Sequence, residues 1–82
     1  MQTFPKIKNN EVVLMRVDAY TGHIFDEQLK LCINDSQIVY TIFPDINEAK
    51  IFLNRNVELH RNIDLTIYDV NENIIEFIKA SF

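Results

Sequence analysis

The stretch from Phe43 to Ile78 constrains the fold most, because a helical pattern and two strand patterns follow one another within it. The patterns predict a helix over about 45–58, a strand over Ile63–Tyr68 and a last strand from Ile74 to about Ala80. A short polar turn separates the two strands, so together they predict a hairpin. A helix next to this hairpin indicates a sheet with one helix packed on it.

The predicted helix has a clear start and one apolar stripe. Asp45 and Glu48 have the spacing of a capping box with Asp in the capping role, and Pro44 fits just outside the first turn. Apolar residues recur after three or four positions, as expected for one face of a helix. They are Ile46, Ala49, Leu53 and Val57. Ile51 falls on the polar side and is expected at the surface.

The strand over residues 63–68 alternates between an apolar and a polar set. The sets are Ile63, Leu65 and Ile67 on one face and Asp64, Thr66 and Tyr68 on the other. This alternation is typical of a sheet with one buried face and one wet face. The turn over 69–73 contains Asn71 and Asn73, and asparagine tolerates the left-handed conformation that tight turns require.

The N-terminal half predicts three further strands in outline. Residues 1–10 read as a loose lead-in to a domain that spans 11–82. The elements after it are a strand over 11–20, a tight turn at Thr21-Gly22, an ambiguous segment over 24–33, a turn over 34–36 and a strand over 37–43. In the ambiguous segment, Phe25, Leu29 and Leu31 alternate as in a strand, but Glu27 breaks the pattern and a short helix is the alternative.

The sequence therefore predicts a single α+β domain with the element order β-β-β-α-β-β. The sheet has four or five strands, mixed or antiparallel, and the order of its strands is left open. One helix covers only one face of such a sheet. The other face must stay wet, find a partner or pack against the N-terminal segment.

Size and composition place limits on the class of protein. The chain has 82 residues, 48% of them hydrophobic, which suits one globular core and excludes disorder. No apolar run approaches the ~20 residues that span a bilayer, and the N-terminus lacks the apolar core of a signal peptide. The single cysteine, Cys32, cannot form an internal disulfide. These features favour a reducing cytoplasm.

The charge balance limits the kinds of partner that the chain can bind. The net charge is −4, and after residue 10 twelve acids face six bases. A surplus of acids disfavours nucleic acid and anionic membranes, which both attract basic surfaces. It permits a basic protein partner, although mild acidity also serves solubility alone.

No motif predicts a metal, a cofactor or a catalytic residue. The turn at Asp69 begins like a calcium loop, but Ile74 stands where that loop needs Gly and Ala80 where it needs Glu. His23 and His60 have no further ligand at zinc spacing. Cys32 lies between apolar neighbours, which predicts a buried and unreactive thiol. The adjacent acids Asp26 and Glu27 point to opposite faces of any strand.

The candidate partner-binding residues are polar and aromatic positions on two strands: Asp18, Tyr20, Asp64, Thr66 and Tyr68. If both strands present them on the same side, they make an acidic surface with two aromatic anchors. The alternative is that such tyrosines only stabilise their cross-strand neighbours.

Three functions remain open at this point. The first is a non-enzymatic module that binds a basic protein, as small inhibitors and immunity proteins do. The second is a small-molecule-binding or enzymatic domain that works as a homo-oligomer, such as a homodimer, with its site between subunits. The third is a structural subunit.

Overall fold

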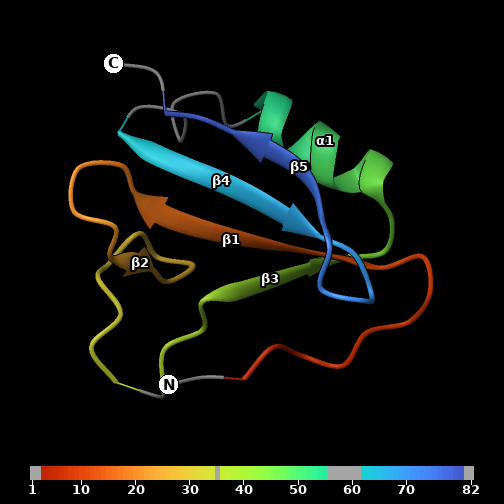
Figure 1. The fold of residues 1–82 in the computed structure, drawn as a ribbon, viewed down its shortest axis with the longest axis horizontal. Coiled ribbons are helices and arrows are strands. Elements are labelled where there is room, and N and C mark those ends of the chain that lie inside the picture. Colours follow the sequence, from red (N-terminus) through yellow and green to blue (C-terminus); the bar gives the residue numbers. More distant parts are fainter. Residues whose placement is uncertain (1–2, 35, 56–61, 81–82) are drawn as a thin grey trace.

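The computed structural model describes residues 3–34, 36–55 and 62–80, which form one sheet and one helix (Figure 1). The elements are β1 (Val12–Asp18), β2 (Ile24–Phe25), β3 (Tyr40–Phe43), α1 (Ile46–Arg55), β4 (Ile63–Tyr68) and β5 (Ile74–Ile78). The predicted α+β class and the order β-β-β-α-β-β are confirmed. β4 has the bounds that the sequence predicts, and β1, β3 and β5 begin or end one to three residues inside theirs, as element ends often do.

The sheet is antiparallel at every pairing, with β1 at its centre. One edge of β1 pairs with β3 along its first half and with β2 at its second half. The other edge pairs with β4, and β5 continues the sheet beyond β4. Because β3 and β4 both run against β1, they are parallel to each other, and α1 forms the connection between them.

The helix starts where the sequence predicts. The Glu48 main-chain N–H donates to Asp45 Oδ1 at 2.8 Å, so Asp45 caps the first turn. Ala49 and Leu53 are buried, whereas Ile51 keeps 42% of its surface exposed, as expected. The end of the predicted helix, from residue 56 on, lies outside the described residues.

The core lies between α1 and one face of the sheet. It is an apolar cluster from three elements: Val12 and Leu14 of β1, Leu65 and Ile67 of β4, and Ala49 and Leu53 of α1. Leu14, Leu65 and Ile67 are completely buried. Burial of each such side chain stabilises the fold by about 1.5–3 kcal/mol before entropy is counted, so this cluster fixes the position of the helix.

The face opposite the helix is largely apolar and partly covered. Cross-strand pairing aligns Val13 with Ile42 and Tyr68, and Met15 with Tyr40 and Thr66. Val13 is completely buried and Thr66 is 5% exposed, so the predicted wet face is wrong at Thr66. The N-terminal segment covers part of this face with a phenylalanine ring, which packs edge to face against tyrosines of two strands. Of the three options for this face, packing against the N-terminal segment is the one observed there.

That ring belongs to Phe4, which lies between two tyrosines of the sheet. Its centroid is 5.6 Å from those of Tyr40 on β3 and Tyr68 on β4, and the planes meet edge to face at 63° and 81°. Such edge-to-face pairs are favourable because the positive ring edge meets a negative ring face. Residues 3–11 contain no helix or strand, yet this contact fixes the segment on the sheet.

The segment over residues 24–33 is neither a long strand nor a helix. Only Ile24–Phe25 forms a strand, and Asp26 then organises a turn. Its Oδ1 accepts hydrogen bonds from the main-chain N–H of Gln28 and Lys30, at 2.8 and 2.9 Å. Leu29 takes a left-handed φ of 61° inside this turn, which breaks the apolar alternation that favoured a strand.

The C-terminal hairpin forms as predicted, but its turn uses a different residue from the one expected. The carboxylate of Asp69 accepts hydrogen bonds from the main-chain N–H of Asn71 and Asn73, at 2.8 and 2.9 Å. The left-handed residue in this turn is Glu72, with a φ of 62°, and not an asparagine. The hydrogen bonds to Asp69 hold the turn and compensate for this conformation.

Candidate interaction surface

Asp18 and Tyr20 lie at the end of β1, in the turn that leads to β2. The Asp18 carboxylate accepts hydrogen bonds from the Tyr20 N–H at 2.9 Å and from Thr21 Oγ1 at 3.1 Å. Gly22 has a φ of 78° and donates its N–H to the Asp18 carbonyl at 2.8 Å. Asp18 thus organises the predicted hairpin turn, and the Tyr20 side chain is 70% exposed.

Asp64, Thr66 and Tyr68 lie on β4, on the face opposite the helix. Asp64 Oδ1 accepts a hydrogen bond from the Ala80 N–H at 2.7 Å, which fastens the chain after β5. Thr66 is buried, and Tyr68 is half-buried against Phe4. All three therefore have structural contacts in the domain.

The strand register separates the two groups of candidate residues. Asp64 is opposite Val17 on β1, whereas Asp18 is opposite Ile63. Directly opposed residues point to the same face of a sheet, and neighbours along a strand point to opposite faces. Asp18 and Asp64 therefore point to opposite faces of the sheet.

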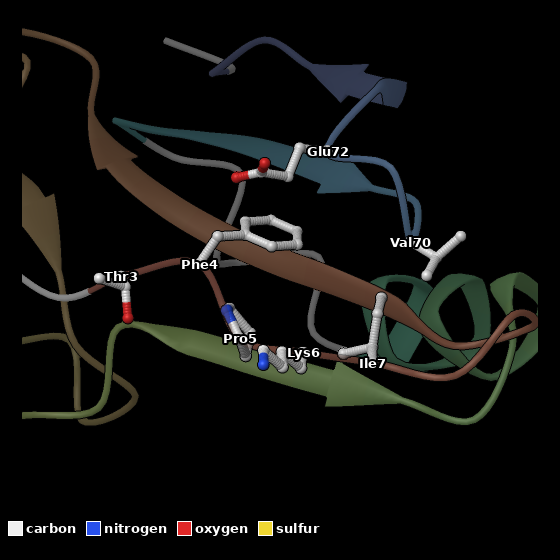
Figure 2. Close-up of a pocket in the computed structure, with 7 residues that line it drawn as sticks. All are labelled: Thr3, Phe4, Pro5, Lys6, Ile7, Val70 and Glu72. Carbon is white, nitrogen blue, oxygen red and sulfur yellow. The ribbon is translucent and has the colours of Figure 1, made fainter.

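A shallow groove of about 680 Å³ runs between the N-terminal segment and the β4–β5 turn. Figure 2 shows its lining, with Thr3 to Ile7 along the N-terminal segment and Val70 and Glu72 on the turn. The ring of Phe4 is part of this lining and lies over the sheet. Burial, then the neighbouring Tyr68 and Glu72, raise the pKa of Tyr40 above its ordinary value.

A polar cluster surrounds the buried Arg16 of β1, on the helix side of the sheet. Arg16 is 3% exposed, and its Nη2 donates to Thr41 Oγ1 at 2.5 Å. Thr41 Oγ1 in turn donates to Glu27 Oε1 at 3.1 Å. Burial lowers the pKa of Arg16, while Glu27 and Asp26 act in the opposite direction. Nη1 is buried and has no hydrogen-bond partner among the described residues.

Asp26 connects this cluster to the loop that follows. Its Oδ2 accepts a hydrogen bond from Gln37 Nε2 at 2.7 Å, in addition to the turn bonds on Oδ1. The Gln37 side chain and then the Lys30 main chain hold the pKa of Asp26 below its ordinary value. The pair Asp26 and Glu27 thus bonds to different partners, and we interpret it as structural.

Sequence reasoning missed the surface of β5. Three of its five side chains are strongly exposed and apolar: Ile74 at 60%, Ile75 at 42% and Phe77 at 55%. β5 is the last strand in the order β2-β1-β4-β5, and no strand of the described chain pairs with its outer edge. The sequence does contain a signal of this surface. An edge strand with one wet face alternates apolar and polar residues, but the sequence of β5 places apolar residues on both faces.

The charge around β5 is negative. Residues 62–80 hold four acids against one base, Lys79, so this hairpin carries a net charge of −3. Glu72 is exposed in the turn and Glu76 is half-buried in the middle of β5. The exposed apolar side chains are therefore bordered by acids.

The described residues contain no cluster of three or more His, Cys, Asp or Glu that could hold a metal ion. His23 is exposed, and His60 lies outside the described chain. Cys32, expected to be buried, is only half-buried, and its Sγ lies 3.6 Å from the Asn34 carbonyl.

Comparison of the chain with protein-family models, with curated proteins and with solved structures found no match in any of the three. Across the described residues, no helix is both long and apolar enough to cross a membrane.

Proposed function

We propose that this chain is a small, acidic, non-enzymatic module that binds a basic protein, in the manner of an inhibitor or immunity protein. One observation carries the proposal. Ile74, Ile75 and Phe77 expose apolar surface on a hairpin whose net charge is −3. Apolar side chains bordered by charges of one sign are typical of surfaces that recognise a partner of the opposite sign.

The proposed interface is centred on β5 and borders on three of the candidate residues, all on β4. Thr66 is directly opposite Phe77 in the sheet, so it supports that ring from the neighbouring strand. Asp64 and Tyr68 lie on the same face of β4, at either side of Thr66. A contact role for Asp18 and Tyr20 stays a separate prediction, because Asp18 points to the other face.

The proposal assigns no catalytic residue and no cofactor, and it excludes nucleic acid and membranes as partners. It places the module in a reducing cytoplasm. The support is compositional: the only cysteine has no internal partner, and the acids outnumber the bases.

A library of short random peptides, panned on the immobilised protein, tests the proposal. We expect enriched peptides with an excess of Lys and Arg, whose binding weakens as salt screens the charges. The matched reference is Phe77→Ser, which removes an exposed apolar side chain and should leave the fold intact. Enrichment of neutral or acidic peptides, or equal enrichment on the Phe77→Ser variant, would contradict the proposal.

A further inference from the structure

Among the described residues, the outer edge of β5 is the longest sheet edge with which no other strand pairs. β5 has five residues, whereas β3 has four and β2 only two on the opposite side of the sheet. An open edge exposes main-chain N–H and C=O groups that can pair with a further strand. Proteins commonly protect such edges with proline, lysine or charge. In β5 the one charged residue is Glu76, and Lys79 comes after its end.

The two faces of β5 offer different chemistry to such a strand. Phe77 is opposite Thr66, so its ring lies on the face away from the helix. Glu76 is opposite Ile67 and Ile78 opposite Leu65, both members of the core under α1, so Glu76 lies on the helix side. One face at the edge is thus apolar and the other acidic.

We propose that the basic partner binds by strand addition: an extended segment of it pairs with the outer edge of β5. Neighbouring strands align their side chains face by face. The bound segment therefore alternates apolar residues, which lie next to Phe77, with lysine or arginine, which lie next to Glu76. The inference rests on the function proposed above, and it adds the partner's conformation and its residue pattern.

Charge favours a partner of this kind over a second copy of the chain. An antiparallel pair of two β5 strands that centres on Phe77 places the two Glu76 side chains diagonally across the interface. Two like charges at this diagonal spacing repel each other. A lysine-bearing segment meets Glu76 with opposite charge and also approaches the net charge of −3 on the hairpin.

The probe for the test is a synthetic peptide that alternates valine and lysine, with capped ends, and a second peptide in which glutamate replaces every lysine. Binding of each is measured by fluorescence anisotropy to the wild-type protein and to Glu76→Lys. We expect the lysine peptide to bind the wild type and to lose about tenfold in affinity on Glu76→Lys, with the preference reversed for the glutamate peptide. Glu48→Lys makes the same change of charge on the exposed side of α1 and should leave both affinities within about twofold.

The backbone pairing is tested by N-methylation of the lysine peptide. In an antiparallel ladder, alternate residues of a strand bond to the neighbour on one side, and the others point away. We therefore expect methylation of one alternate set of amides to abolish binding and methylation of the other set to be tolerated. Equal effects of the two sets would overturn strand addition while leaving the proposed function in place.

The remaining outcomes are also decisive. Equal affinity of the lysine peptide for the wild type and for Glu76→Lys would overturn the inference, and so would no binding at all. The random library decides the proposed function separately in both cases. Sedimentation of the protein alone tests whether a second copy of the chain occupies the β5 edge instead. A dimer that dissociates on Phe77→Ser would show that it does and would overturn the inference.

Discussion

Phe4→Ala is the substitution that most directly tests whether the N-terminal segment is part of the folded domain. The ring makes two edge-to-face contacts, to Tyr40 and Tyr68, each with centroids 5.6 Å apart. Aromatic pairs contribute about 0.5–1.5 kcal/mol each beyond the burial of area. Two pairs and a half-buried ring therefore predict a loss of about 2 kcal/mol in the free energy of unfolding, below the range for a fully buried phenylalanine.

Urea denaturation measures this loss. Small domains have urea slopes of about 1–3 kcal/mol per molar, so a loss of about 2 kcal/mol should lower the midpoint by about 0.7–2 M. The chain has no tryptophan and three tyrosines, two of which contact Phe4. Tyrosine fluorescence therefore reports both the loss of the Phe4 contacts and the unfolding of the whole domain.

Two further variants make the result specific. Phe4→Leu keeps apolar surface but loses both ring contacts, and we expect a midpoint between those of the wild type and Phe4→Ala. Lys6→Ala changes an exposed side chain in the same segment and should leave the midpoint unchanged. A Phe4→Ala midpoint equal to that of the wild type would refute the reasoning, since the segment would then contribute nothing to stability.

Three other predictions concern single groups. Because the pKa of Tyr40 is raised in the folded protein, its neutral form stabilises the fold below pH 10, and this stability is lost as pH rises through the folded-state pKa. An absorbance titration should show that the pKa of Tyr40 falls toward its ordinary value of 10.0 in the Phe4→Ala variant. Thr41→Val leaves Arg16 Nη2 buried without its partner and should cost about 1–3 kcal/mol, which Arg16→Met in the same chain should largely restore; additive losses in denaturation would contradict this coupling. Asp45→Ala removes the helix cap and should cost about 1 kcal/mol in thermal denaturation, whereas Asp45→Asn should cost far less.

The parts of the fold that depend on neighbouring residues could be predicted. The Asp45 cap, the exposed Ile51 and the hairpin over Ile63–Ile78 follow from spacings of two to four residues, and all are found. The turn at Asp26 also depends on neighbouring residues only, because the Asp26 carboxylate accepts hydrogen bonds from main-chain N–H groups two and four residues later. Apolar alternation concealed it, because Leu29 fits a strand pattern and occupies a left-handed turn position.

The candidate surface depends on long-range pairing that the sequence does not specify. Whether Asp18 and Asp64 share a face is decided by the register of β1 against β4, and a shift of one residue reverses it. The half-burial of Tyr68 likewise depends on Phe4, which is far away along the chain. The exposure of Phe77 follows from β5 being the outermost strand, and the strand order was left open.

The most direct test of the account is a two-dimensional NMR titration of the labelled protein with the valine–lysine peptide. The account predicts that the largest amide shifts fall in Ile74–Ile78, with smaller shifts on β4 and none along the exposed side of α1 around Ile51. Shifts centred on the turn with Asp18 and Tyr20, on Ile51, or spread evenly over the acidic surface would contradict the claim that the open edge of β5 is the binding site.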